Sequence, residues 1–202
     1  MKLAVLQHHQ QEHPGLIRDW AQQQQIELVY WHSEQQPSFA AVTAFDGVIV
    51  LGGEYNVKDR AEHPWMQAEL AWLQQALDAN RPIVAICLGA QMLAHLLGST
   101  VKPLSTPEFG AVTLTRDNGQ QLQVLQAHHY HVALPQGATL HGSTALCAEQ
   151  IYHHAPTRVL GLQCHLEWTQ SMYQQLIGPL PEFDHRDAQT LLFALLDRHF
   201  KR

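Results

Sequence analysis

The sequence predicts an α/β fold: a doubly wound, mostly parallel sheet with flanking helices and a small antiparallel addition. Apolar runs of strand length alternate along the chain with segments whose apolar residues recur at helical spacing. The run at residues 82–86 is apolar on both faces, as expected for a strand that helices cover on each side of a parallel sheet. A helical pattern begins directly after this run, which places a sharp strand-to-helix turn at residue 87.

The first half of the chain fits this alternation. Residues 2–7 predict a first strand and residues 26–31 a second, with a helix over about residues 14–24 between them. Pro14 fits the first turn of that helix, and Pro64 opens a later one. The later helix has an apolar stripe, which we assign to the core and not to a cofactor site, formed by Met66, Leu70, Leu73 and Leu77.

The pattern changes in the second half, from about residue 100 to residue 157. Short segments there suggest antiparallel additions beside the functional site, at residues 111–115, 122–126 and 144–152. The chain then returns to an apolar strand that ends in His165. It closes with a helix for which Asp184 is a candidate N-cap. One face of that helix is apolar and contains Ala188, Leu191, Leu192, Leu195 and Leu196.

Length, composition and charge favour one globular domain over residues 1–202. The formal net charge of -6, without a long Lys/Arg run, argues against a nucleic-acid partner and against an anionic membrane surface. No segment reaches the roughly 18 apolar residues of a membrane span, and the chain enters a strand without a basic leader. The three cysteines at positions 87, 147 and 164 fit a reducing compartment, so we expect a cytoplasmic protein.

Cys87 is the strongest candidate for a nucleophile. It lies on the predicted turn between strand and helix, where Ala85 and Gly89 allow the two backbones to approach closely. A thiol at a helix N-terminus faces the positive end of the helix dipole, which can lower its pKa to about 3.5 to 7.5. The alternative is a buried, inert cysteine at the end of a core strand, a common setting for free cysteine.

A second candidate site lies in the apolar strand that ends in His165, with Glu167 two residues farther on. If the extended conformation persists, both side chains point to one face, and the carboxylate can hydrogen-bond the imidazole and orient it. Cys87, His165 and Glu167 would then form a triad, in which the histidine takes the thiol proton and later donates it to a leaving amine. The alternative is a histidine at a strand end beside a solvated acid.

Paired glycines supply the third part of the predicted site. An apolar strand at residues 46–51 runs into Gly52 and Gly53, which let a backbone N–H approach a ligand. The N–H groups of Gly53 and of Leu88, directly after the nucleophile, could stabilise the oxyanion of a tetrahedral intermediate, at about 2.7 to 4 kcal/mol per donor. A Gly-Gly pair is more often a plain turn, so this assignment depends on its place at the carboxyl end of a strand.

Together these residues resemble the class I, triad-type glutamine amidotransferases, and most closely the amidotransferase domain of GMP synthases and their stand-alone relatives. The likeness spans nearly the whole chain and is carried by four segments in the family's order, at residues 51–59, 85–91, 107–110 and 163–167. It implies the flavodoxin-like sheet of that family. It also implies a set of residues that help hold the glutamine substrate, namely Gln91, Glu108, Phe109, Gly110 and the backbone around His128 and His129.

The chain departs from the family's pattern at several positions. Ala85 replaces the glycine usual in the turn, where a methyl group should still fit. Glu54 replaces the proline that commonly follows the paired glycines, and it adds a negative charge beside the proposed oxyanion site. Cys164 replaces a phenylalanine, and strand alternation turns it away from the catalytic face. In residues 127–130 only His128 matches the family, so the substrate beyond the glutamyl group is open.

The resemblance implies hydrolysis of a glutamine side-chain amide, in which the Cys87 thiolate forms a glutamyl thioester and ammonia is released. The chain has no room for a synthase domain, so any acceptor synthase would be on a separate chain. Two alternatives stay open: a stand-alone γ-glutamyl hydrolase or peptidase that acts on γ-glutamyl conjugates, and an inactive binding or regulatory relative. A papain-like protease is disfavoured, because the cysteine lies mid-chain without a Cys-Gly-Ser-Cys-Trp signature.

Three histidine pairs invite a metal interpretation, because imidazole is a common metal ligand: residues 8–9, 128–129 and 153–154. Adjacent residues of a strand point in different directions, and we see no carboxylate or cysteine at ligand spacing beside the pairs. We therefore expect no metal and no cofactor, and place most of these histidines at the surface. His9, just past the first strand, could instead line the cleft.

Overall fold

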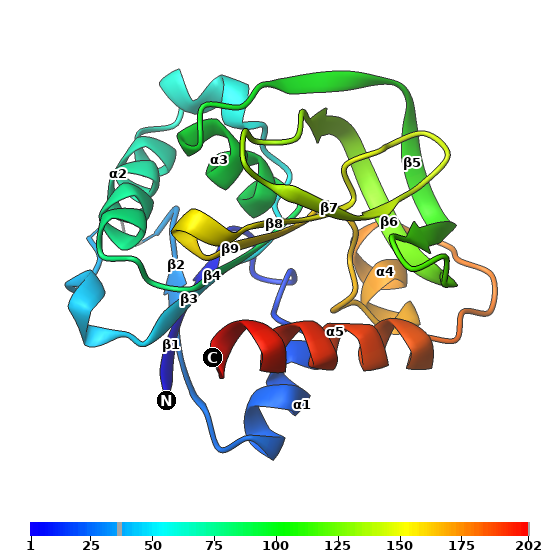
Figure 1. Ribbon diagram of the computed structural model, residues 1–202, viewed down its shortest axis with the longest axis horizontal. Coiled ribbons are helices and arrows are strands. Elements are labelled where there is room, and N and C mark those ends of the chain that lie inside the picture. The colour runs from blue at the N-terminus through cyan, green and yellow to red at the C-terminus, as the bar shows by residue number, and fades with distance from the viewer. Residues whose placement is uncertain (36–37, 202) are drawn as a thin grey trace.

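The computed structural model describes residues 1–35 and 38–201, and a single sheet of nine strands runs through them (Figure 1). Its first half is parallel, with the spatial order β2 (Glu27–His32), β1 (Lys2–Gln7), β3 (Gly47–Val50), β4 (Ile83–Ile86) and β9 (Val159–Leu162). In the register of the central strands, Val84 of β4 lies between Ile49 of β3 and Leu160 of β9.

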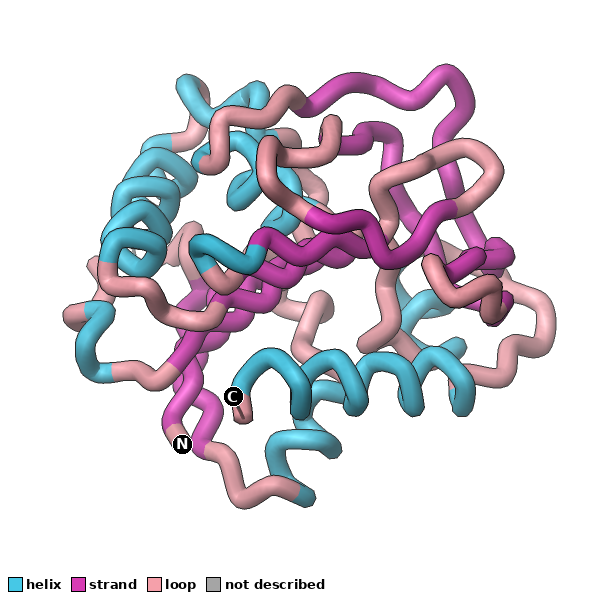
Figure 2. The backbone as a smooth tube through the Cα atoms, viewed as in Figure 1, coloured by secondary structure: helices cyan, strands magenta, loops and turns pink. Residues whose placement is uncertain are grey.

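The second half of the sheet is antiparallel and continues from β9 in the order β8 (Ile151–His154), β7 (Thr139–Ser143), β5 (Val101–Arg116) and β6 (Gln121–Val132). The long hairpin of β5 and β6 is visible as paired magenta segments in Figure 2. The predicted α/β sheet with an antiparallel addition is confirmed, although the addition is larger than expected. The strand expected at residues 144–152 begins only at Ile151, because residues 144–150 form a loop, and β7 was not predicted.

Helices cover both faces of the parallel half, as a doubly wound sheet requires (Figure 1). One face carries α1 (Leu16–Gln23) and α5 (Arg186–Phe200), and the opposite face carries α2 (Pro64–Asp78) and α3 (Leu88–Leu96). The short α4 (Gln170–Leu176) packs against Leu125 of β6. Three 3₁₀ turns complete the helical elements of the described chain, namely η1 (Val42–Ala44), η2 (Val57–Ala61) and η3 (Ala155–Thr157).

Side chains along β4 point alternately into two cores, which explains why a run without polar residues predicted a strand covered on both faces. Val84 and Ile86 join the cluster that contains α1 and α5, whereas Ile83 and Ala85 join the cluster that contains α2 and α3. All four side chains are fully buried. The two cores therefore fix β4 on both sides, and with it the residue that follows.

Two predicted helix starts differ from the structure by one or two residues. Pro14 precedes α1, whose N-cap is Gly15. The N-cap of α5 is His185, so the prediction of Asp184 was wrong by one residue; the Asp184 Oδ1 nevertheless accepts from the Arg186 N–H at 3.0 Å. Pro64 is the first residue of α2, as expected.

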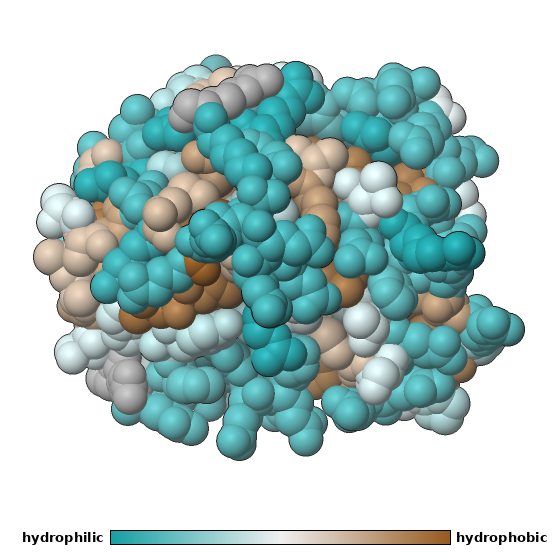
Figure 3. All heavy atoms as spheres, turned by 90° about the horizontal axis from the view of Figure 1, so that it is seen from below, coloured by the Kyte–Doolittle hydropathy of each residue, from teal (hydrophilic) through white to brown (hydrophobic). Residues whose placement is uncertain are grey.

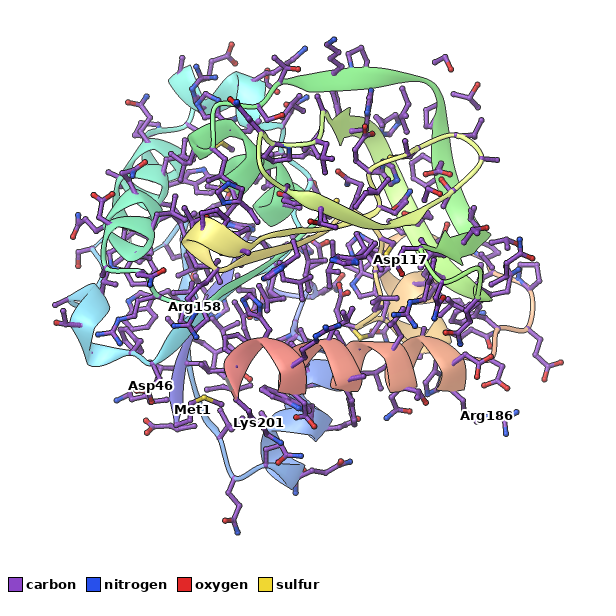
Figure 4. All side chains as sticks on the ribbon, in the orientation of Figure 1. Met1, Asp46, Asp117, Arg158, Arg186 and Lys201 are labelled. Carbon is purple, nitrogen blue, oxygen red and sulfur yellow. The ribbon has the colours of Figure 1, made fainter. Side chains whose placement is uncertain are left out.

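The outer surface is largely hydrophilic, with apolar patches between the polar side chains, as the view in Figure 3 shows for one face. Basic side chains are spread over the molecule: Arg158, Arg186 and Lys201 lie well apart in Figure 4. None of the helices in the described residues combines the length and the hydropathy of a membrane-spanning segment.

Gly89 should be required for the close contact between α3 and β3. A Cβ atom at this position would lie 2.5 Å from the Val50 carbonyl oxygen and 2.9 Å from the Val50 Cβ, and backbone cannot give way as a flexible side chain can. We expect Gly89→Ala to lower the free energy of unfolding by about 1–3 kcal/mol, the usual range for overpacking. Urea denaturation measures this as a lower midpoint at constant slope. An unchanged midpoint would show that the contact can relax.

Candidate active site

Cys87 forms the connection between β4 and α3, at the sharp turn predicted there, and its backbone is strained. Its φ of 49° and ψ of -107° are costly for any residue other than glycine. Two hydrogen bonds hold the turn: the Cys87 N–H donates to the Leu162 carbonyl at 2.7 Å, and the Gly89 N–H donates to the Leu51 carbonyl at 3.2 Å. The methyl group of Ala85 is accommodated in the core. The thiol is therefore presented at the carboxyl edge of the sheet by a rigid frame.

His165 and Glu167 lie beside Cys87, although the strand does not continue to them as expected. β9 ends at Leu162, and His165 is held instead by its N–H, which donates to the Leu125 carbonyl of β6 at 2.9 Å. His165 Nδ1 lies 2.7 Å from Glu167 Oε1, and the Cys87 side chain lies close enough to raise the pKa of the ring. The structure thus brings together all three members of the predicted triad.

The electrostatics of this group favour a charged imidazole. Burial on its own lowers the pKa of His165, but the charge of Glu167 and hydrogen bonds to Cys87 and Glu167 outweigh it and raise the pKa to about 10. At neutral pH the ring therefore carries both protons. An imidazolium in this position can pair with a thiolate and can give its second proton to a leaving group.

Two contacts that the sequence analysis missed hold the histidine and its acid. The Trp168 ring stacks on His165, with ring centroids 3.5 Å apart and an interplanar angle of 13°. The Leu16 N–H, in the first turn of α1, donates to the Glu167 carbonyl at 2.9 Å. Gly15 allows this approach, because a Cβ there would lie 2.1 Å from the same carbonyl oxygen. The nearness of Trp168 to His165 in the sequence was the only signal for either contact.

The paired glycines lie against the nucleophile. A Cβ at Gly52 would lie 3.4 Å from the Cys87 Cβ, and one at Gly53 would lie 2.9 Å from the side chains of both His8 and Leu88. Among the described residues, no acceptor is found for the N–H of Gly53 or of Leu88. For Leu88 this follows from its place as the first residue of α3, since the first turn of a helix has no internal acceptors. Gly53 also lines the cavities beside Cys87, whereas Leu88 is fully buried and lines neither of them.

A cavity of about 270 Å³ opens beside Cys87 and contains most of the expected substrate contacts. Gln91, Phe109, His128 and His129 line it, together with Gly53, Glu54, Tyr55, Asn56, Ala127, Tyr130 and Ile177. The Oε1 atom of Gln91 is buried without a hydrogen-bond partner among the described residues. A buried acceptor without a donor is costly, so a ligand with a donor group would gain from this position.

Glu108 and Gly110 do not line this cavity, contrary to what the resemblance implied. The Glu108 carboxylate is buried and accepts hydrogen bonds at 2.6 Å from both the Thr144 hydroxyl and the Gln150 amide. Its Oε2 also lies 3.1 Å from Nε2 of His128, but outside hydrogen-bond geometry. Glu108 therefore stands behind His128, where it can orient a residue of the cavity wall.

A second, smaller cavity of about 80 Å³ lies on another side of Cys87 and is acidic. Glu12, Glu54 and His9 contribute its polar groups, and its apolar wall is formed by Ala127, Trp168, Leu176 and Ile177. Burial raises the pKa of the Glu12 carboxyl, against the opposing charges of His165 and two neighbouring histidines. Glu12 was not singled out from the sequence. The suggestion that His9 lines the cleft agrees with its place here.

The histidine pairs are less exposed than expected, since His8, His128 and His154 are buried. Within the described chain, the only group of metal-ligand type is His131, Cys147 and Glu149, whose ligand atoms lie within 4.8 Å of one another. The spacing of Cys147 and Glu149 was not recognised from the sequence as that of metal ligands. Burial raises the pKa of the Cys147 thiol to about 12, which keeps it protonated in this structure.

Comparison with known proteins decides the family. The family described as "Glutamine amidotransferase class-I" matches residues 11–177, most of the chain. The chain belongs to the class I glutamine amidotransferase family. A curated relative in this family, a glutamine amidotransferase-like protein from Salmonella typhimurium, is 28% identical over 194 residues, covering 88% of this chain and 80% of its own. One subunit of a glutamine-hydrolysing GMP synthase from Saccharolobus solfataricus is 29% identical over 132 residues, 61% of this chain and 68% of the relative.

Solved structures agree with this class I glutamine amidotransferase fold. A crystal structure of a glutamine amidotransferase from Thermotoga maritima superposes with a TM-score of 0.86 at 21% identity, and covers 100% of this chain and 99% of that one. At this identity the likeness shows the fold alone. The match to family and fold confirms the resemblance drawn from the four segments.

Proposed function

We propose that the protein hydrolyses the γ-amide of a glutamyl substrate through a thioester on Cys87. The observation that carries the proposal is the convergence of two distant segments: a thiol on a strained turn, and an imidazole beside it whose Nδ1 lies 2.7 Å from Glu167 Oε1. The family supports glutamine as the source of the amide, because it is a family of glutamine-hydrolysing proteins.

In the first half of the reaction, the Cys87 sulfur attacks the γ-carbonyl carbon, and the C=O electron pair moves onto oxygen. The N–H groups of Gly53 and Leu88 donate to that oxyanion, each contributing about 2.7–4 kcal/mol. When the carbonyl reforms, the C–N bond breaks, and His165 gives a proton to the departing nitrogen, which leaves as ammonia. His165 is then neutral, and the glutamyl group is bound to sulfur as a thioester.

In the second half, His165 takes a proton from water, and the hydroxide attacks the thioester carbon. The C–S bond breaks and restores the thiolate beside the imidazolium, and the new carboxyl group releases its proton to solvent as glutamate leaves. Glu167 holds the ring through Nδ1 in both halves and is not protonated itself. Gln91, Phe109, His128 and His129 line the cavity on which the glutamyl group would lie, with the unpaired Gln91 Oε1 as an acceptor for its ammonium.

The ammonia would pass to an acceptor synthase on a separate chain. The similarity to a protein named as one subunit of a GMP synthase supports this division. We place the reaction in the cytoplasm, since the three cysteines are all free and a thiolate nucleophile persists in a reducing compartment.

The experiment that tests this function is an assay of the isolated chain on glutamine and on a set of γ-glutamyl amides, with ammonia, amine and glutamate measured. Release of ammonia and glutamate in equal amounts from glutamine supports the proposal. If every compound is left intact, even in the presence of a synthase captured with the chain, the protein is an inactive binding or regulatory relative.

A second candidate is a stand-alone hydrolase of γ-glutamyl conjugates, and the small acidic cavity favours it. Glu12 and Glu54 line this space beside Cys87, and the apolar wall suits a short alkyl chain. No Lys or Arg of the described chain contributes to its lining. A leaving group in this cavity that carries a few methylene groups and its own ammonium group would gain apolar contact with the wall and attraction to the two carboxylates.

Neutralising these acids should separate the two candidates. For the conjugate hydrolase, Glu54→Gln and Glu12→Gln are each expected to raise KM for a γ-glutamyl diamine by about 5- to 20-fold, since a partly exposed ion pair contributes on the order of 1 kcal/mol or slightly more. KM for glutamine should stay within about twofold, because glutamine carries no charge on its leaving group. Glu62→Gln, an exposed acid outside both cavities, is the matched control. Equal effects on both substrates would exclude a site for a cationic leaving group.

A further inference from the structure

A buried ion pair lies directly behind the paired glycines and has no part in the reaction described above. His8 follows β1, and Glu69 lies in α2; neither side chain is exposed. His8 Nε2 lies 2.9 Å and 3.1 Å from the two carboxylate oxygens of Glu69, and His8 Nδ1 lies 2.8 Å from the Gly52 carbonyl oxygen. The Trp65 ring packs against the histidine, with ring centroids 5.4 Å apart.

The partners of His8 determine its protonation. A carbonyl oxygen and a carboxylate both accept hydrogen bonds, so both ring nitrogens of an imidazolium find an acceptor here. Burial on its own lowers the pKa of His8, but the charge and hydrogen bond of Glu69, the Gly52 carbonyl and the charge of Glu12 together raise it to about 9. At neutral pH, therefore, the positively charged His8 ring donates a hydrogen bond to the Gly52 carbonyl oxygen.

The direction of the Gly52 carbonyl determines the direction of the next N–H. Within the described chain all peptide bonds are trans, and in a trans peptide the C=O and N–H point in opposite directions. With the Gly52 oxygen directed at His8, the Gly53 N–H is directed away from it. That N–H has no acceptor among the described residues, and a Cβ on the adjoining Gly52 would lie 3.2 Å from His165 Cε1 and 3.4 Å from Cys87 Cβ.

We propose that His8 and Glu69 are positioning residues that hold the Gly52–Gly53 peptide in the orientation whose N–H stabilises the oxyanion. This inference rests on the proposed function. A peptide between two glycines has little intrinsic preference for one orientation, because both residues tolerate conformations that other residues avoid. The buried donor supplies the preference, and its charge further polarises the peptide so that the Gly53 N–H becomes a stronger donor.

Two double variants test the position of the donor without leaving a buried charge. In His8→Asn/Glu69→Gln, the shorter amide can place a nitrogen where Nδ1 was and can still donate to Gly52. In His8→Gln/Glu69→Gln, the longer side chain places its nitrogen near the former Nε2, away from Gly52. Both remove the ion pair, so the two proteins differ mainly in the hydrogen bond to the peptide.

We expect kcat of His8→Gln/Glu69→Gln to fall by about 10- to 100-fold. This is less than the loss of about 10²–10³ that follows removal of a whole oxyanion donor, because the Gly53 N–H is still present but is held less well. KM should change by less than about threefold, because the contact acts in the transition state and not in substrate binding. His8→Asn/Glu69→Gln should keep kcat within about fivefold of the parent. Equal losses of kcat in the two variants, or a loss confined to KM, would overturn the positioning role.

A readout that does not depend on turnover separates this inference from the proposed function. In ¹⁵N NMR spectra at pH 7.5, both ring nitrogens of His8 should be protonated, and the Gly53 amide signal should move when His8 titrates near pH 9. The step near pH 9 should be absent from the same signal in His8→Asn/Glu69→Gln. A neutral His8 at pH 7.5 would contradict the inference even if the parent hydrolyses glutamine, whereas an inactive parent with a charged His8 would contradict only the function.

The ion pair also predicts how stability depends on pH. His8 has a folded pKa of about 9, above the unfolded value of about 6.5, so its stabilisation is complete below about pH 6.5 and is lost as pH rises through 9. The charged groups that face it are Glu69 and Glu12. The difference in unfolding free energy between the parent and His8→Asn/Glu69→Gln should therefore shrink between pH 6.5 and 9.5. A difference independent of pH would exclude a charged pair.

Discussion

Replacing Cys87 by serine is expected to lower kcat for amide hydrolysis by at least about 10⁴-fold, in line with the loss of the nucleophile in other triad enzymes. The serine hydroxyl is nearly isosteric, so the strained turn and the fold should persist, but its proton is far harder to remove than that of a thiol. The measurement is steady-state release of glutamate, with circular dichroism and urea denaturation to confirm the fold.

Cys147→Ser is the matched control for this change. Cys147 is equally free and buried, but burial raises its pKa to about 12 and it lines neither cavity beside Cys87. Its replacement should leave kcat within about twofold. If Cys87→Ser retained the activity of the parent, the thioester mechanism would be excluded.

The second large effect is expected at His165. Removing the imidazole in His165→Ala eliminates both the base for the thiol and the acid for the leaving nitrogen, so kcat should fall by about 10⁴-fold or more. Glu167→Ala should cost less, by about one to two powers of ten, because an unsupported imidazole still reaches Cys87 in part of its orientations.

The pH profile distinguishes the two variants further. Burial lowers the pKa of His165, and the charge of Glu167 is the largest of the contributions that raise it to about 10. Without it, the histidine pKa should fall, and the imidazolium needed for proton donation should be lost at a lower pH than in the parent. The alkaline limb of kcat should therefore move to lower pH in Glu167→Ala. A Glu167→Ala profile that coincides with the parent would show that the carboxylate does not act through His165.

The part of the site that could be predicted from sequence lies in short, local patterns. The turn at Cys87 follows from an apolar run, a small residue two positions before and a glycine two positions after. His165 and Glu167 are two residues apart, so their contact needed only local geometry, and it is made even though β9 ends at Leu162. The parallel half of the sheet was predictable for the same reason, because each of its strands is a short apolar run.

The remainder depends on contacts between distant residues. His8 and Glu69 are 61 residues apart, and neither lies in a motif that marks a partner. The segment around Glu108 indicated a substrate contact, but the Glu108 carboxylate is satisfied by Thr144 and Gln150, which follow it by 36 and 42 residues. The antiparallel half was underestimated for a related reason: pairing of β5 with β7 is set by packing, and polar, half-exposed strands have weak periodicity.

Activation of Cys87 as a nucleophile can be measured by its reaction with a glutamine-like electrophile, such as a γ-glutamyl chloromethyl ketone, followed by intact mass measurement and peptide mapping. We expect one adduct per chain, located on Cys87, with a labelling rate that glutamine reduces and that His165→Ala nearly abolishes. A chain that stays unlabelled, or that is labelled only at Cys147 or Cys164, would contradict that activation.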